Sequence, residues 1–192
     1  IVHALDEVNK ALRRGEYFWV DIVRDGVVLY DLPCHPLTTP RPLTSADAYQ
    51  MAKGYFDHWL PSADEFYDNF AFNLKQNRRS NAAFQLHQAT ERLYICFLLV
   101  RTLYFPRSHN ITFLRSLAED KDPRLIGAFP RGTRIDRRRF EMLKRAYVEA
   151  RYSPSYEIGI DDLDALAVSV NRLREIVEAV CIERMGELRS GE

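Results

Sequence analysis

The chain has 192 residues, 46% of them hydrophobic and 12% aromatic, so it can bury the core of one medium-sized domain and is not disordered. Its 27 basic and 27 acidic side chains balance, but residues 78–152 carry 16 basic against 7 acidic side chains. That basic third favours a nucleotide or another polyanion as partner, or else helices that pair with the acidic parts on either side.

Two classes of protein are excluded by the same composition. No apolar run is long enough to span a bilayer, so we expect no membrane partner. The three cysteines are widely spaced and odd in number, which gives neither a disulfide framework nor a metal-binding pattern. We therefore expect a cytoplasmic protein.

The first 33 residues have the pattern of a small α/β unit. In chain order they predict a strand, a helix and two further strands, over Ile1–His3, Leu5–Arg14, Tyr17–Val23 and Val27–Leu32. Asp25 and Gly26 lie between the last two runs, and Asp-Gly is typical of a tight β-hairpin turn. Because an isolated hairpin is marginal in water, we interpret residues 1–33 as the C-terminal remnant of a larger α/β domain and the chain as a piece of a longer protein.

Residues 34–44 form a predicted linker, because three prolines occur there and no helix tolerates that density. A helix is then expected from Ser45 or Asp47, with a kink or a break at Pro61. Its apolar positions are spaced four and three residues apart, at Ala52, Phe56, Trp59, Ala63, Phe66 and Phe70.

The clearest helical pattern precedes Pro106. Apolar residues again alternate four and three apart, at Ala82, Leu86, Ala89, Leu93, Cys96, Val100 and Leu103. A short helix over Ile111–Ala118 is expected to be capped by Asn110, and two more helices begin near Arg134 and Ile160. The sequence therefore predicts a mainly α protein whose residues 45–188 form an up-and-down bundle.

Motifs for catalysis and for metal binding are weak. His87 and Glu91 lie one helical turn apart, but no third ligand is near in sequence, so we interpret the pair as a structural contact and predict no metal site. Ser108 and His109 are neighbours, which is not triad geometry, and no glycine-rich phosphate loop occurs. We predict no catalytic residue.

Basic and aromatic residues near two helix ends are the candidates for binding. They are Arg101, Arg107 and His109 at one end, and Arg145, Arg151 and Tyr152 at another. Arginines suit phosphates, and Tyr152 beside Arg151 suits stacking on a base. The alternatives are dipole contacts at helix ends, pairing of the basic stretch with the acidic last helix, and tyrosines that pack in the core.

Three motifs in this order resemble the HEPN domain family over Ala46 to Val180. They are His87-Gln88-Ala89 with Glu91-Arg92, Pro106-Arg107-Ser108-His109-Asn110, and Ala150-Arg151-Tyr152. The resemblance implies a five-helix bundle that is often dimeric and often joined to a minimal nucleotidyltransferase domain. Residues 17–31 are then similar to the last hairpin of that domain. Its Gly-Ser and paired-aspartate motif is absent from the sequence, so we expect no transferase activity and no cofactor in this chain, and Mg²⁺ with nucleotide in the full-length protein.

The expected function is binding of an ATP-like nucleotide or an acceptor substrate, together with homodimerisation and without readout of DNA sequence. One branch of the family comprises ribonucleases, in which an arginine shortly precedes a histidine. Seven residues separate Arg101 from His109 and also Arg79 from His87, and neither spacing fits. A diverged ribonuclease or toxin acting on RNA through Arg101 and His109 is one alternative. A non-catalytic dimerisation module of a toxin–antitoxin-like system is the other.

Overall fold

The computed structural model describes residues 2–191, and in this range it contains seven α-helices, one short 3-10 helix and no strand. The helices are α1 (Leu5–Arg13), α2 (Tyr17–Asp25), α3 (Ser45–Lys75), α4 (Arg79–Thr102), α5 (Ile111–Lys121), η1 (Pro123–Ala128), α6 (Arg134–Tyr152) and α7 (Ile160–Ser190). The prediction of a mainly α protein is therefore confirmed.

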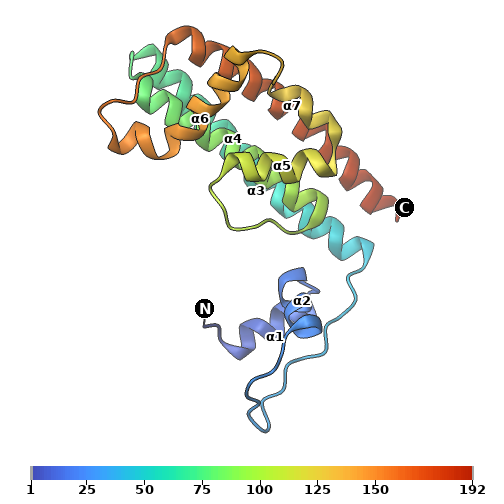
Figure 1. Ribbon diagram of the computed structural model, residues 1–192. Coiled ribbons are helices and arrows are strands. Elements are labelled where there is room, and N and C mark those ends of the chain that lie inside the picture. The colour runs from blue at the N-terminus through green and yellow to red at the C-terminus, as the bar shows by residue number, and fades with distance from the viewer. Residues whose placement is uncertain (1, 192) are drawn as a thin grey trace.

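Helices α3 to α7 form a bundle with α4 at its centre (Figure 1). α4 packs against α3, α5, α6 and α7. Its second half, Leu93–Val100, is buried on every side, and a helix that is apolar all round is stable only when neighbours cover it all round. The stripe on α4 was predicted from the sequence, and it is the axis of the core.

Local capping sets where the helices of the bundle begin. The Asn110 side chain accepts from the backbone N–H of Thr112 at 3.0 Å, so the predicted cap of α5 is confirmed. α3 begins at Ser45, but its cap is Thr44, whose hydroxyl accepts from the Asp47 N–H at 3.1 Å. Thr133 and Asp136 make a reciprocal capping box at the start of α6.

Two further features of the helices are the proline inside α3 and the left-handed residue after α4. Of the predicted kink or break at Pro61, the break is wrong, because α3 runs without interruption through Pro61. Pro61 is exposed, and water can reach the carbonyl group that its missing N–H leaves unbonded. α4 ends at Thr102, and its C-cap Leu103 has a left-handed φ of 56° that turns the chain away from the helix axis.

The predicted strand–helix–hairpin unit at the N-terminus is wrong in its strands. Tyr17–Asp25 is the helix α2, and Val27–Leu32 has no strand partner among residues 2–191. Gly26 has φ of −74°, whereas the tight hairpin turn needs positive φ at both central residues. Of the predicted strand Ile1–His3, Ile1 lies outside the described residues, and Val2 and His3 are not in a strand. The predicted helix at Leu5 is confirmed as α1.

The N-terminal helices lie beyond the end of the bundle at which α3 begins (Figure 1). No helix occurs in residues 26–44, which return along α1. There the side chain of Asn9 accepts from the Thr38 N–H at 2.6 Å and donates to the Pro36 carbonyl at 3.3 Å. The division into residues 1–33, 34–44 and 45–188 stays a prediction.

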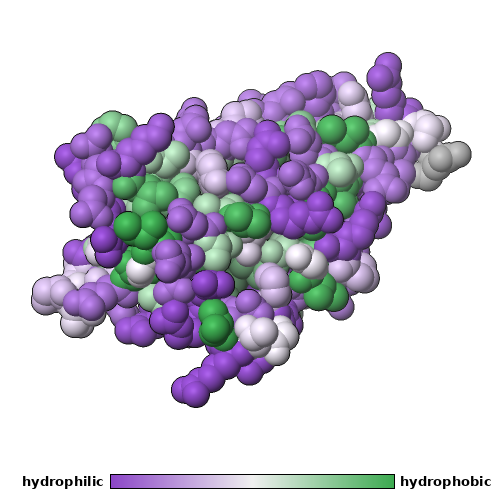
Figure 2. All heavy atoms as spheres, turned by 90° about the horizontal axis from the view of Figure 1, so that it is seen from above, coloured by the Kyte–Doolittle hydropathy of each residue, from purple (hydrophilic) through white to green (hydrophobic). Residues whose placement is uncertain are grey.

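Hydrophilic side chains cover most of the face of the molecule drawn in Figure 2, and hydrophobic ones gather there in separate patches. No helix within residues 2–191 has the length and the apolar composition that crossing a bilayer requires.

Candidate functional site

Five side chains meet where α4, α6 and the loop before α5 come together. α4 contributes His87 and Glu91, α6 contributes Tyr147 and Arg151, and the loop contributes His109. On each helix the two residues are four apart, which places them on one face. Because α4 and α6 pack together, the two faces meet. We call this group, with Tyr152, the aromatic–basic cluster.

A histidine and a buried carboxylate form the centre of the cluster. His109 Nδ1 lies 3.1 Å from Glu91 Oε1; the Glu91 side chain is 3% exposed and that of His109 is 66% exposed. The other carboxylate oxygen, Glu91 Oε2, is buried without a hydrogen-bond partner among the described residues. An ionised Glu91 accepts the proton of His109 Nδ1, which leaves Nε2 as the nitrogen available to a ligand.

The imidazole rings of two histidines stack on Tyr147. Its ring stacks on His109 at 5.1 Å between centroids and on His87 at 5.2 Å. His87 is 1% exposed. Burial, helped by the nearby charges of His109 and Arg151, lowers the pKa of His87 from its usual 6.5 to about 3. His87 is therefore neutral near pH 7 and packs against Tyr147, while His109 is the histidine that faces solvent.

Arg151 forms the exposed part of the cluster. Its guanidinium carbon lies 4.9 Å from the ring centre of Phe84, 4.6 Å from that of Tyr147 and 5.0 Å from that of Tyr152. Arg151 Nε donates to the Tyr147 carbonyl at 2.7 Å, and no carboxylate pairs with the guanidinium within residues 2–191. Tyr152 is 74% exposed. A cation surrounded by ring faces is a surface on which planar bases stack and to which phosphates bind.

The six residues selected from the sequence do not all lie in this cluster. His109, Arg151 and Tyr152 do. Arg101 Nη1 instead lies 3.4 Å from Glu187 Oε2 on α7, and Arg145 donates to Glu149 at 2.7 Å on its own helix. Arg107 faces a separate cavity between the bundle and the N-terminal helices.

Part of the basic stretch pairs with acidic side chains of α7. Arg138 and Arg139 lie 2.7 Å and 2.9 Å from the carboxylate oxygens of Asp162. Arg124 lies 2.8 Å from Glu183. Together with Arg101, four of the 16 basic side chains of residues 78–152 therefore pair with α7, as the pairing alternative from the sequence expects for them. Others have no ion pair within residues 2–191, and Arg151 is one of these.

The sequence interpretation assigned no binding role to Glu91, His87 and Tyr147. The signal was present as polar side chains on the edge of the apolar α4 stripe and as two pairs four residues apart. It could not show that the pairs face each other, because 55 residues lie between Glu91 and Tyr147 in the chain. Among residues 2–191, no group of three or more His, Cys, Asp or Glu side chains could hold a metal ion.

Comparison with models of protein families gives a match. The chain is similar to the model of the HEPN domain family over residues 56–185, which is about two thirds of its length. The matched range begins inside α3 and includes all of α4, α5 and α6, and with them every member of the aromatic–basic cluster. A search of the curated proteins found no match.

Proposed function

The chain belongs to the HEPN domain family, and we propose that this domain binds a nucleotide or an acceptor substrate at the aromatic–basic cluster. The proposal rests on the surroundings of Arg151. Arg151 lies against three aromatic rings without a carboxylate partner in the described residues, beside an exposed histidine. A guanidinium in that setting is available to a phosphate.

Each residue of the cluster has a distinct role in this proposal. Arg151 holds a phosphate group, and the exposed ring of Tyr152 stacks on the base. His109 Nε2 hydrogen-bonds the ligand, and Glu91 fixes the orientation of the imidazole ring from the other side. Arg101 and Arg145 would first have to release Glu187 and Glu149, so we give them no primary role.

The proposal includes a wider setting. We propose that the domain forms a homodimer and acts beside a nucleotidyltransferase domain in the cytoplasm. Support comes from the run Val27–Tyr30, whose side chains are between 71% and 94% exposed and would be covered by a neighbouring domain. The binding step needs no metal ligand from this chain, and Mg²⁺ would accompany the nucleotide.

Titration of the chain with ATP in a calorimeter tests the binding step. We expect saturable binding that Arg151→Gln weakens about tenfold, because a charge-assisted hydrogen bond is lost. Tyr152→Ala should weaken it by a similar factor through lost stacking. Arg134→Gln is the matched control, since Arg134 is exposed, lies at the far end of α6 and has no ion pair within residues 2–191. No heat at millimolar ATP, or equal affinity in Arg151→Gln and Arg134→Gln, contradicts the proposal.

Ribonuclease activity is a second candidate, favoured by the contact between His109 and Glu91. An imidazole oriented by a buried carboxylate is suited to general acid–base catalysis. If the domain cleaves RNA, His109→Ala abolishes cleavage, and Glu91→Gln reduces it while ATP affinity changes less. Intact RNA after incubation with the purified wild-type chain removes this candidate.

A further inference from the structure

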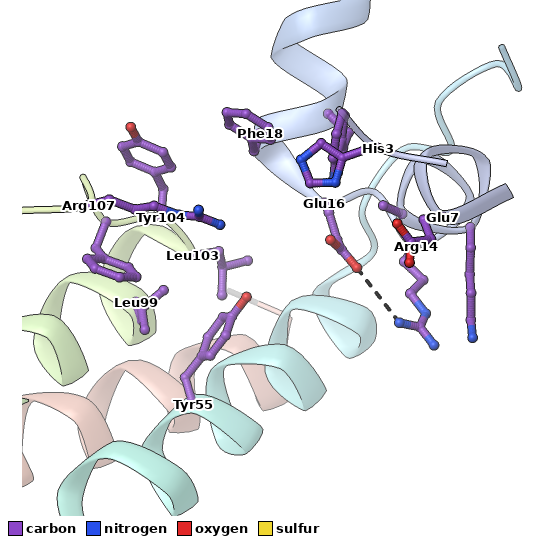
Figure 3. A pocket seen from close by; sticks show the side chains of 14 residues that line it. His3, Glu7, Arg14, Glu16, Phe18, Tyr55, Leu99, Leu103, Tyr104 and Arg107 are labelled. Carbon is purple, nitrogen blue, oxygen red and sulfur yellow. Dashed lines mark ion pairs between the residues drawn. The ribbon is translucent and has the colours of Figure 1, made fainter. Parts of the chain in front are cut away.

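A cavity of about 660 Å³ lies between the N-terminal helices and the end of the bundle (Figure 3). Its walls come from α1, α2, α3, the end of α4 and the loop that follows α4. This volume is within the range of clefts that hold small organic molecules, and junctions between structural units are where such clefts are common. We call it the junction cavity.

Apolar side chains lie on both sides of the junction cavity, among charged ones. Leu99, Leu103 and Tyr55 line the bundle side, and Phe18 and Trp19 line the α2 side. Trp19 is held in place by edge-to-face contacts with Phe18, at 5.0 Å between ring centroids, and with a histidine at the start of the chain. Opposed apolar walls of this kind fit a flat ring system.

The charges around the cavity leave a cation available at one end. Arg107 points toward the space between the walls in Figure 3, and among residues 2–191 it has no hydrogen bond to an acidic side chain and no ion pair. Glu16 on the opposite wall is already paired with Arg14, at 3.8 Å. Lys10 and Glu7 on α1 also line the cavity without an ion pair within the described residues, and their opposite charges offset each other. An anionic group is therefore favoured near Arg107.

We propose that the junction cavity binds a small organic anion with a flat aromatic body. The ring lies between Phe18 and Trp19 on one side and Leu99 and Leu103 on the other, and the carboxylate or phosphate of the ligand pairs with Arg107. This site shares no residue with the aromatic–basic cluster, so it is a binding activity beyond the proposed function.

The native tryptophans allow a direct readout of this site. The chain has two, Trp19 and Trp59, so Trp59→Phe leaves one tryptophan, and that one lines the cavity. The probe is 8-anilinonaphthalene-1-sulfonate, an aromatic anion with a flat naphthalene ring, whose emission rises in apolar surroundings. In the full chain with Trp59→Phe we expect one saturable site, with energy transfer from Trp19 to the bound probe.

Two variants and one neutral probe identify what binds. Arg107→Gln should weaken probe binding about tenfold, because the anion loses a charge-assisted hydrogen bond. The matched control Arg134→Gln, with the same change of charge on an exposed arginine, should leave it unchanged. Phe18→Ala, at a side chain 48% exposed and so not needed for the core, should weaken it too. N-phenyl-1-naphthylamine, which lacks the sulfonate, should bind with equal affinity in wild type and in Arg107→Gln.

Competition shows which anion the site prefers and separates the two proposals. Displacement of the probe by benzoate or by phenyl phosphate supports the site and names the preferred group. Arg151→Gln should leave probe binding unchanged, whatever it does to ATP binding. Failure of both competitors, several equivalent probe sites, or equal affinity in Arg107→Gln and Arg134→Gln overturns the proposal.

Discussion

The bundle and the N-terminal segment, residues 2–44, both contain many hydrophobic side chains, but the bundle buries them and the segment leaves most of them exposed. In helices α3 to α7, aromatic and aliphatic residues form one continuous core, and many charges are paired across helices. In residues 2–44 the buried hydrophobic side chains are Ala11 and Leu12, while Val27 to Tyr30 are mostly exposed. Hydrophobic and charged side chains stabilise a fold when they are buried or paired, and their presence in the sequence is not enough. We therefore expect the bundle to contribute most of the free energy of unfolding.

The largest expected effect comes from matched truncations in the two regions. Phe97 on α4 is fully buried, so Phe97→Ala should lower the free energy of unfolding by about 3–5 kcal/mol. Val28→Ala removes a side chain that is 71% exposed and should change it by less than about 0.5 kcal/mol. Urea unfolding followed by circular dichroism measures both, and Phe97→Leu serves if Phe97→Ala does not fold. A clear loss of stability in Val28→Ala would show that the segment is part of the core.

A second comparison concerns pH and two histidines. His87 has a pKa of about 3 in the folded chain and about 6.5 when unfolded, so between these values the unfolded state binds more protons. Stability from this residue is complete above pH 6.5 and falls as the pH drops, by about 2 kcal/mol between pH 7 and pH 5.

Urea unfolding over this pH range tests the assignment. His87→Gln should remove that part of the acid sensitivity, whereas His35→Gln, at an exposed histidine in residues 26–44, should keep the wild-type slope. An unchanged slope in His87→Gln would mean that His87 is not the group responsible.

The smallest expected effects concern helix caps. Asn110→Ala removes the side-chain acceptor at the start of α5 and should lower the free energy of unfolding by about 1 kcal/mol, and Asn110→Asp should retain most of it. α1 begins after Ala4, which makes no side-chain cap. Ala4→Ser should therefore add helicity at α1 without moving the unfolding midpoint of the bundle. A shift of that midpoint would contradict the separation between the two regions.

Local patterns in the sequence predicted the bundle well because its helices depend on local information. The spacing of the α4 stripe and the cap at Asn110 both depend on residues that are only a few positions apart in the chain. The hairpin prediction failed because a strand, unlike a helix, depends on residues outside its own segment. Tyr17–Val23 has the composition of a strand, but a strand needs a partner edge, and the described residues supply none. A helix satisfies the same backbone groups within the segment.

The candidate site was predicted in part, and distance along the chain explains the rest. His109, Arg151 and Tyr152 were selected because arginine and aromatic residues occur close together in sequence. Arg101 was selected for the same reason, yet its carboxylate partner Glu187 is 86 residues away. Glu91 was not selected, because its role depends on a contact with His109, which is 18 residues away in the chain. Pairings across helices are fixed by packing, and no local pattern encodes them.

The loop from Leu103 to Asn110 has a consequence for regulation. It is held at one end by the left-handed turn at Leu103 and at the other by the cap of α5. Arg107 and His109 lie two residues apart on it, so the junction cavity and the aromatic–basic cluster share one short tether. If an occupant of one site displaced the loop, the geometry of the other site would change with it. Thermodynamic reciprocity would then require each ligand to change the affinity of the other by the same factor, and this loop would be the point of communication between two chemically different signals.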